Sequence, residues 1–340
     1  MGVKLKKLSD QVVVITGASS GIGLVTARMA AKQGARLVLA ARTEGALRQL
    51  ESEINGQGGE AVAVVADVGN EGDVAQIARA ATERFHGFDT WVNDAGVSVY
   101  GKLEQISVED HRRLFETNFW GVVYGSLAAA KHLKDRGGAI INVGSTLSDR
   151  AIPLQGMYVA SKHAVKGFTD ALRMELEEEG SAVSVTLVKP AAIDTPYTKH
   201  AKNYLNEEPK NPPPVYAPEA VASAILHCAA NPVRDVFVGG AGKMFSVMDK
   251  YAPRLTDRVM ERAMFSQQHS GVPKQTHGDR ALYQGKAGLE ERGGYRGHVM
   301  ESSAYTKASL HPFLTGAAVV GTGLLAAAAL MGTGDGRRRR

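Results

Sequence analysis

Cysteine is nearly absent from this chain of 340 residues: Cys228 stands alone, which excludes a disulfide within the chain. The N-terminal residues also lack the apolar run of a secretory signal peptide. Lys6 occupies the position at which an N-myristoylation signal requires Ser or Thr. These absences predict a protein that is made and kept in a reducing compartment, and we expect it to be cytoplasmic.

An excess of one charge sign is absent too, apart from the last four residues. The formal net charge is +5, and residues 337–340, all arginine, supply four of these positive charges. The remainder is nearly neutral, so we expect no nucleic-acid partner. With 44% hydrophobic and 22% charged residues, the composition is that of an ordinary globular protein. We expect no metal site.

Short apolar runs alternate with helical patterns over residues 1–240. Runs such as Val12-Val13-Val14-Ile15 fit strands that are buried on both faces. The short connections between strands and helices predict an α/β fold, a Rossmann-type doubly wound parallel sheet of about seven strands. Residues 108–134 are expected to form one long helix, or nearly so. Strands are expected at 11–16, 36–41, 61–66, 89–92, 139–143, 182–188 and 236–238.

A glycine-rich loop lies between the first predicted strand and the first predicted helix. Gly17, Gly21 and Gly23 give the spacing Gly-x-x-x-Gly-x-Gly. Glycine permits a tight turn there and lets phosphate oxygens approach the backbone. The free N–H groups and the positive dipole end of the following helix would then face the phosphates. The loop therefore predicts a nucleotide-binding site.

The end of the second predicted strand indicates which nucleotide is used. An acidic residue there would accept hydrogen bonds from a free ribose 2′-hydroxyl, and this chain has none at that point. Arg42 instead suits a 2′-phosphate, because a guanidinium group can bind it through two hydrogen bonds. Glu44 lies close by, and Arg42 as an ordinary solvated charge is the alternative. The stretch predicts a preference for NADP(H).

Tyr158 and Lys162 lie four residues apart, which places them on one face of a helix. A lysine ammonium favours the phenolate, so the pKa of Tyr158 is predicted to fall, and such a tyrosine can exchange a proton during a redox step. Ser145 follows the strand predicted at 139–143, at the edge where open α/β sheets bind their ligands. The alternative is that Tyr158 and Lys162 merely lie on a helix surface.

Together these features resemble the short-chain dehydrogenase/reductase family. The resemblance covers about residues 9–240 and is highly specific, because several motifs occur in the family's order and spacing. The chain departs from the family at Asp94, where a second Asn is usual, and at Ala191, where Gly usually follows Pro190. The matching motifs are Thr16-Gly17-x-x-x-Gly21-Ile22-Gly23, Asp67, Asn93-x-Ala95-Gly96, Asn118, Ser145 and Tyr158-x-x-x-Lys162.

The resemblance implies a catalytic tetrad of Asn118, Ser145, Tyr158 and Lys162. In this pattern Tyr158 is the general acid or base, and Ser145 hydrogen-bonds the substrate oxygen. Lys162 holds the nicotinamide ribose, and Asn118 anchors a water that relays protons. Besides Tyr158 and Lys162, the residues implied for cofactor binding are Gly17, Ser19, Ser20, Gly21, Ile22, Gly23, Arg42, Asp67, Val68, Asn93, Ala95, Gly96, Pro190, Ile193 and Thr195.

The function implied is an NAD(P)-dependent oxidoreductase that interconverts a carbonyl and a secondary alcohol on a small-molecule substrate. Two alternatives remain open: an NAD-linked dehydrogenase working in the oxidative direction, and a catalytically idle nucleotide-sensing or scaffold protein on the same fold. Family members are usually dimers or tetramers, so a homo-oligomer is expected. For Asp67 alone, adenine binding and helix capping are equally consistent with the residues.

Several stretches fall outside the α/β alternation. The proline-rich residues 191–216 are interpreted either as a substrate-covering segment or as a surface excursion. Residues 241–265 have the periodicity of an amphipathic helical extension, which Pro253 should kink or split. Residues 266–312 are polar and Gly-rich and are predicted to be a flexible linker.

The C-terminal residues carry opposing signals. Residues 313–331 contain no charge and are long enough to approach the thickness of a bilayer, which makes them a candidate membrane segment. The basic residues 332–340 favour the cytoplasmic side, so a full span conflicts with cytoplasmic NADP(H). We expect membrane contact through this tail, and a shallow insertion avoids the conflict. The alternative is a helix docked on the enzyme or on a second subunit.

Overall fold

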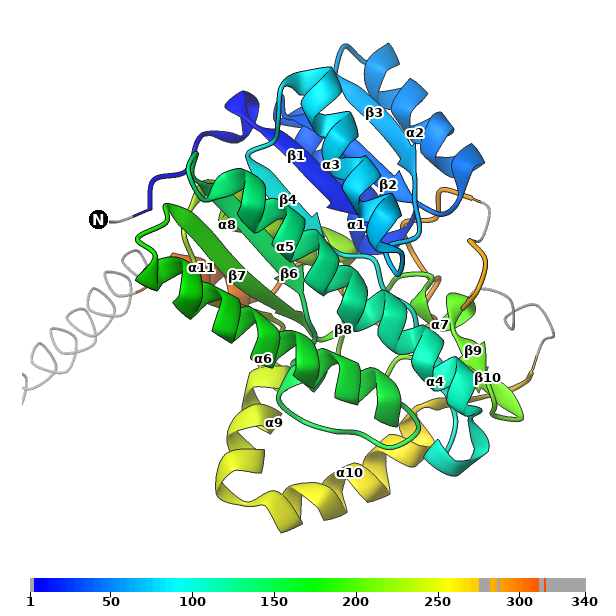
Figure 1. Ribbon diagram of the computed structural model, residues 1–340. Helices are drawn as coiled ribbons and strands as arrows, with labels where there is room; N and C mark the ends of the chain where they lie inside the picture. The colour runs from blue at the N-terminus through cyan, green and yellow to red at the C-terminus, as the bar shows by residue number, and fades with distance from the viewer. Residues whose placement is uncertain (1–2, 275–281, 286–287, 312–314, 316–340) are drawn as a thin grey trace, which may run out of the picture.

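A computed structural model of the protein describes residues 3–274, 282–285, 288–311 and 315. Its centre is a parallel sheet of seven strands in the order β12-β7-β6-β4-β1-β2-β3 (Figure 1). The sequence prediction of a doubly wound α/β fold with seven parallel strands is confirmed. The strands are β1 (Val12–Thr16), β2 (Arg36–Ala41), β3 (Ala61–Val65), β4 (Thr90–Asn93), β6 (Gly138–Val143), β7 (Val183–Pro190) and β12 (Asp235–Val238).

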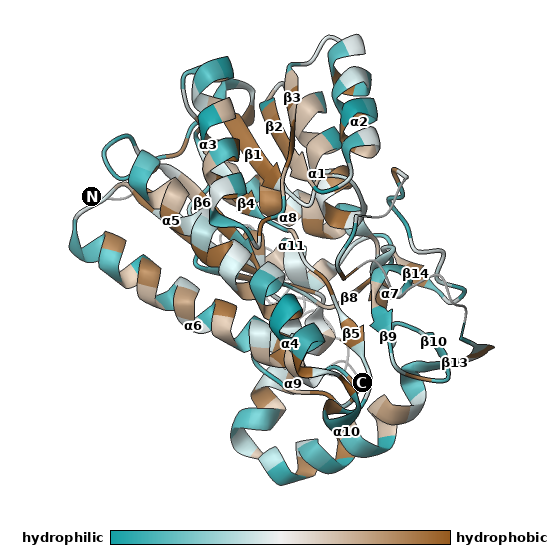
Figure 2. Ribbon diagram, turned by 45° about the vertical axis from the view of Figure 1, so that its right-hand side comes forward, coloured by the Kyte–Doolittle hydropathy of each residue, from teal (hydrophilic) through white to brown (hydrophobic). Residues whose placement is uncertain are grey.

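Helices cover both faces of this sheet. One face carries α1 (Gly21–Lys32), α2 (Glu44–Gly56) and α8 (Pro218–Ala230), whose buried side chains share one apolar core with the strands. The opposite face carries α3 (Glu71–Phe85), α5 (Gly121–Leu133) and α6 (Gly156–Glu178), which form a second core. The strands are therefore buried on both sides, and Figure 2 shows them as the most hydrophobic part of the ribbon.

The chain order reverses between β1 and β4. From β1 the sheet is built outward through β2 and β3, whereas β4, β6, β7 and β12 extend it on the other side. A crevice opens at such a switch point, outside the carboxyl ends of the two strands. The turn after β1, which is the predicted nucleotide loop, and the loop after β4 thus face each other there.

The nearly continuous helix expected at 108–134 is confirmed, but it contains a π-helical turn that the sequence did not predict. The structure has α4 (Val108–Phe115), a π-helical turn over Glu116–Trp120, and then α5. Asn118 lies in the π turn with its side chain fully buried, donating to the Val97 carbonyl and accepting from the Val97 N–H. Insertions of this type widen a helix locally and are frequent at functional sites.

Short elements complete the carboxyl side of the sheet. Pairing joins β5 (Val99–Tyr100) to β9 (Lys202–Asn203), and β10 (Glu207–Pro209) to β13 (His269–Pro273). A small three-stranded sheet combines β8 (Ala192–Ile193), β11 (Val215–Tyr216) and β14 (Val299–Met300). The remaining helices are α7 (Tyr197–His200), α9 (Gly240–Tyr251), α10 (Pro253–Gln267) and α11 (Ala304–Leu310). α9 ends where Pro253 begins α10, because proline suits a first helical residue but not a helix interior.

The described part of residues 266–312 does not behave as the linker predicted from its composition. β13 and β14 pair with strands of the main domain, and α11 packs against β12 and α8. Leu282 is fully buried. These contacts join residues far apart in the sequence, which the polar, Gly-rich local pattern did not reveal.

The predicted membrane tail, residues 313–331, and the basic residues 332–340 lie outside the described residues except for Thr315. Within the ranges that the structure does describe, none of the helices combines the length and the apolar character that a membrane crossing requires.

Candidate active site

A cavity of about 340 Å³ occupies the crevice at the carboxyl edge of the sheet. Its size is in the range of small-molecule sites. Most residues predicted from the sequence line it, whereas Gly23, Asn93 and Asn118 lie behind its wall. The predicted residues in the lining are Gly17, Ser19, Ser20, Gly21, Ile22, Arg42, Asp67, Val68, Ala95, Gly96, Ser145, Tyr158, Lys162, Pro190, Ile193 and Thr195.

The glycine loop is packed too closely for side chains. Gly17 has a φ of +76°, and a Cβ there would lie 2.9 Å from the backbone of Ala95. A Cβ on Gly23 would overlap the Gly17 carbonyl. The hydroxyl of Thr16 accepts hydrogen bonds from the Asp94 and Ala95 N–H groups at 3.1 and 3.2 Å. This packing holds the N-terminus of α1 against the crevice, where its dipole favours an anion, so the loop fits a dinucleotide pyrophosphate.

Asn93 has a different place from the one its motif implied. Its side-chain amide donates to Asn142 at 2.8 Å and to Ser126 at 3.1 Å, and its carbonyl accepts from Trp91 at 2.8 Å. All four side chains are fully or almost fully buried. Asn93 therefore ties β4 to β6 and α5 from inside the core and supports the cofactor wall from behind, because buried amides need such partners.

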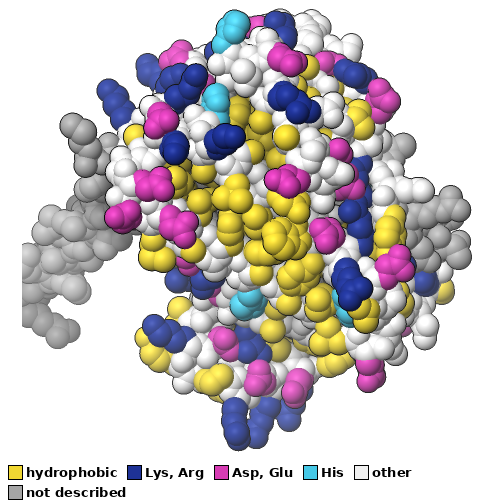
Figure 3. All heavy atoms as spheres, in the orientation of Figure 1, with side chains coloured by type: hydrophobic (Ala, Val, Ile, Leu, Met, Phe, Trp, Pro, Cys, Tyr) yellow, Lys and Arg dark blue, Asp and Glu magenta, His cyan; other side chains and the backbone are white. Residues whose placement is uncertain are grey.

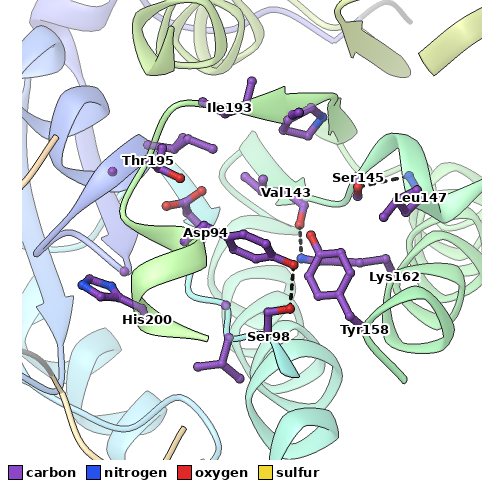
Figure 4. Close-up of a pocket in the computed structure, with 18 of the residues that line it drawn as sticks. Asp94, Ser98, Val143, Ser145, Leu147, Tyr158, Lys162, Ile193, Thr195 and His200 are labelled. Atoms are coloured by element: carbon purple, nitrogen blue, oxygen red, sulfur yellow. Dashed lines mark hydrogen bonds between the residues drawn. The ribbon is translucent and has the colours of Figure 1, made fainter. Parts of the chain in front are cut away.

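Ser145, Tyr158 and Lys162 meet in the same crevice (Figure 4). Tyr158 and Lys162 project from α6, with the Lys162 Nζ 5.7 Å from the centre of the Tyr158 ring. Ser145 lies just after β6, where its Oγ accepts from the Leu147 N–H at 3.0 Å. Lys162 is almost fully buried and donates to the Val143 carbonyl at 2.8 Å.

The predicted fall in the pKa of Tyr158 is contradicted by the structure. Burial raises this pKa, while hydrogen bonding with the Ser145 and Tyr197 hydroxyls lowers it and the Asp94 carboxylate raises it further. The desolvation of a phenolate outweighs the effect of the neighbouring hydroxyls. Tyr158 consequently keeps its proton at neutral pH.

Asp94 and Lys162 form an electrostatic pair beneath the crevice. Burial lowers the pKa of Lys162 to about 8, and the Asp94 carboxylate opposes that change. Burial raises the pKa of Asp94 to about 7, opposed by Lys162 and by a hydrogen bond from the Gly23 N–H. Each charge thus partly compensates the desolvation of the other. Asp94, noticed in the sequence only as a departure from the family, is part of the site.

Asn118 lies next to the helix that carries the tyrosine. Besides its two bonds to Val97, its Nδ2 donates to the Ser161 hydroxyl at 3.2 Å. The Ser161 hydroxyl in turn donates to the Tyr158 carbonyl at 2.7 Å. The side chain therefore links the π turn to the start of α6.

The crevice is also lined by Arg42 and Asp67. The Asp67 carboxylate forms an ion pair with Arg113 of α4, and its Oδ1 accepts from the Gly69 N–H at 3.0 Å. The Arg42 Nη1 donates to the Leu282 carbonyl at 3.0 Å, and Glu44 lies 3.8 Å from Arg48. Arg42 is thus held at the cavity wall by a backbone carbonyl, while the neighbouring acid, Glu44, lies close to Arg48.

Sequence reasoning missed Tyr197, Ser98 and Gln155. The Tyr197 hydroxyl donates to the Gln155 Oε1 at 2.9 Å and lies 2.8 Å from the Ser98 hydroxyl, and its ring is 5.5 Å from that of Tyr158. Tyr197 comes from the proline-rich stretch, and residues 195–197 and 211–214 line the cavity. The position of Tyr197 favours the interpretation of residues 191–216 as a substrate-covering segment over that of a surface excursion. No local spacing marks Tyr197, because its partners lie far away in the sequence.

Comparisons with known proteins point in one direction. The family model described as short chain dehydrogenase matches residues 11–205. The uncharacterized oxidoreductase YxnA of Bacillus subtilis is 50% identical over 329 residues, which are 96% of this chain and 92% of that protein.

Two solved structures share the fold. A short-chain dehydrogenase/reductase from Burkholderia phymatum in complex with NAD matches with a TM-score of 0.62 and 27% identity, over 81% of this chain and all of that one. An alcohol dehydrogenase from the archaeon Thermococcus sibiricus, complexed with 5-hydroxy-NADP, matches with a TM-score of 0.59 and 29% identity, over 67% of this chain and 95% of that one.

The Asp94 carboxylate raises the pKa of both Lys162 and Tyr158, so Asp94→Asn should lower both. The amide keeps the shape of the side chain and an acceptor for the Gly23 N–H. We expect the pH-dependent limb of kcat/KM to move to lower pH in a full pH–rate profile. Asp10→Asn, a change at an exposed acid, is the control. A limb that stays in place or moves to higher pH would show that Asp94 does not act on these groups.

Proposed function

Because this chain belongs to the short-chain dehydrogenase family, we propose that it is an NADP(H)-dependent oxidoreductase that interconverts a carbonyl group and a secondary alcohol. The observation that carries this proposal is the meeting of Ser145, Tyr158 and Lys162 in a crevice that a glycine loop at a helix N-terminus also lines. An idle sensor would not require a proton donor, a substrate-orienting hydroxyl and a buried lysine at the same point.

The cofactor and the residues of the crevice would have separate roles in the reaction. A bound nicotinamide cofactor would supply the exchange of a hydride with the carbonyl carbon. Tyr158 would give a proton to the developing alkoxide in the reductive direction, which suits a phenol whose raised pKa keeps it protonated. The Ser145 hydroxyl would orient the substrate oxygen. Lys162 would hold the nicotinamide ribose. Asn118, whose side chain is engaged by Val97 and Ser161 outside the cavity lining, would position the start of α6 instead of holding the water that the family pattern implies.

The preference for NADP(H) is supported by two guanidinium groups at the adenosine end. Arg42 lines the cavity beside Thr43, and Arg113 lies near it through their shared acceptor, the Leu282 carbonyl. Guanidinium groups suit a 2′-phosphate. The acid in this neighbourhood, Asp67, is neutralised by its ion pair with Arg113.

The walls beyond Tyr158 favour an apolar substrate. Leu147, Ile152, Phe245, Met260 and Met264 line the cavity and belong to one apolar cluster that α9 and α10 complete. Two polar side chains of this wall are paired within the protein, Arg150 with Asp249 and Asp257 and Gln155 with Gln268. We propose a carbonyl compound with an extended hydrocarbon body.

We also propose that the protein forms a homo-oligomer, because it exposes large apolar side chains. Large apolar side chains are exposed on α4, α5, α6 and the turn between α4 and α5, namely Val108, Trp120, Leu127 and Met174. Figure 3 shows apolar side chains gathered over this face of the molecule. Exposed apolar patches of this kind mark interaction sites.

Removing the proton donor should abolish turnover without abolishing nucleotide binding. Tyr158→Phe is expected to lower kcat by about 10²–10⁴-fold, the usual contribution of a positioned acid or base. NADPH oxidation with a ketone and NADPH binding by fluorescence are measured in parallel, with the exposed Tyr251→Phe as the control. Near wild-type turnover in Tyr158→Phe would contradict the assignment, and a wild type that binds NADPH yet reduces no carbonyl class would favour the sensor.

Cofactor choice is tested at the end of β2. Ala41→Asp combined with Arg42→Ala should lower the ratio of kcat/KM for NADPH over NADH by roughly 10–100-fold, the contribution of one or two hydrogen bonds to a charged group. Arg48→Ala on the same side of the molecule is the control. The idea fails if the unaltered enzyme prefers NADH or if the ratio does not change in the double variant.

Substrate character is tested with a homologous series of 2-alkanones. Burial of each methylene contributes about 0.8 kcal/mol, which predicts a rise of about four-fold in kcat/KM per carbon until the cavity is filled. Phe245→Ala should flatten this dependence, whereas Met174→Ala, at an exposed site on α6, should not. Turnover that is indifferent to chain length would rule out an apolar substrate while leaving the reaction class intact.

A further inference from the structure

A segment from far along the sequence crosses the nucleotide end of the crevice. It comprises residues 282–285 and 288–295, here called the strap, which Figure 1 shows in orange near α7. Its residues Gln284 and Gly285 line the same cavity as Arg42 and Asp67. We propose that the strap is a wall of the nucleotide site that positions Arg42 and Arg113 and holds the bound dinucleotide in place; this rests on the nucleotide binding proposed above.

The strap contacts the two arginines through its backbone. The carbonyl of Leu282, a fully buried residue, accepts from the Arg42 Nη1 at 3.0 Å and from the Arg113 Nε at 3.3 Å. Arg113 also pairs with Asp67, which lies two residues after β3. One carbonyl thus orients two guanidinium groups from separate elements. Because these long side chains are already held in place, they lose less conformational freedom when they bind a phosphate.

Two glycines let the strap press against residues of the site. A Cβ on Gly285 would overlap the Thr43 hydroxyl, and a Cβ on Gly293 would overlap the Thr195 carbonyl. Between them, the Glu290 carbonyl accepts from the Gly21 N–H at 2.9 Å, at the start of α1. The strap therefore touches three parts of the nucleotide site: the end of β2, the glycine loop and the segment after β7.

The contacts that hold the strap lie outside the cavity. Glu291 pairs with Arg28 of α1 at 2.7 Å, and Arg292 pairs with Glu219 of α8 at 2.9 Å. The Asp194 carboxylate accepts from the backbone N–H of Gly293 and of Tyr295 at 3.1 and 2.9 Å. Ion pairs to α1 and α8 and hydrogen bonds to Asp194 thus hold the strap in place.

The cavity remains beside the strap, since Ser19, Ser20 and Ile22 line it together with Gln284 and Gly285, although the Glu290 carbonyl occupies one N–H at the start of α1, that of Gly21. The strap is accordingly a wall of the site rather than a plug that fills it. A dinucleotide that leaves through this end must displace the strap, so its loss should accelerate nucleotide dissociation.

The sharpest variant is Gly285→Ala, because the added methyl group cannot coexist with the Thr43 hydroxyl in the present arrangement. Its matched control is Gly45→Ala at the start of α2, where a Cβ meets no atom within 4 Å. Stopped-flow fluorescence of bound NADPH should show dissociation at least ten-fold faster in Gly285→Ala and unchanged in Gly45→Ala. A dissociation rate that is unchanged or slower in Gly285→Ala, or an affinity that is unchanged or tighter, would overturn the proposal.

A second variant avoids the interior of the site. Arg292→Gln removes the ion pairs to Glu219 and Glu301 and should also speed dissociation, whereas Arg296→Gln, at an exposed position, should not. In the full chain, hydrogen exchange of the Gly293 and Tyr295 amides should slow on addition of NADPH. Faster exchange would show that nucleotide and strap compete, which contradicts a retaining wall.

These readouts require no turnover. They are repeated with NADH, so a wrong assignment of cofactor or reaction is distinguished from a wrong assignment of the strap. If either nucleotide binds and the strap variants alter its release, the strap proposal stands even when no carbonyl is reduced.

Discussion

The absence of side chains at Gly17 and Gly23 is the constraint on which the site depends. Because no Cβ stands between them, the turn after β1, the start of α1 and the loop after β4 come into direct contact. The same packing brings the Asp94 carboxylate to the Gly23 N–H, directly below the crevice. The helix dipole, the buried acid and the Lys162 ammonium therefore belong to one electrostatic arrangement.

Desolvation decides the protonation of this arrangement. A lysine four residues from a tyrosine was predicted to lower the pKa of the phenol, but burial raises it, and it also lowers the pKa of the lysine itself. Lys162 donates to the Val143 carbonyl on the side of β6, so its hydrogen bond supports the strand edge rather than the phenol. The resulting neutral tyrosine is suited to giving a proton.

The residues beyond β12 add walls to the crevice. At the substrate end, α9 and α10 add Phe245, Met260 and Met264 to an apolar wall. At the nucleotide end, Gln284 and Gly285 face the cavity beside Arg42. Both additions are attached by contacts to the sheet and to α1 and α8, so they behave as parts of one domain and not as appendages.

The order of strands and helices, the glycine loop and the shared helix face of Tyr158 and Lys162 could all be read from the sequence alone. These features are local, and spacing along the chain reports them directly. The π turn at Asn118, the inward turn of Asn93, the contribution of Tyr197 and the strap depend on partners far away along the chain. The direction of the Tyr158 pKa depends on burial. Only the tertiary structure decides these, because desolvation and long-range hydrogen bonds are set by what the fold brings together.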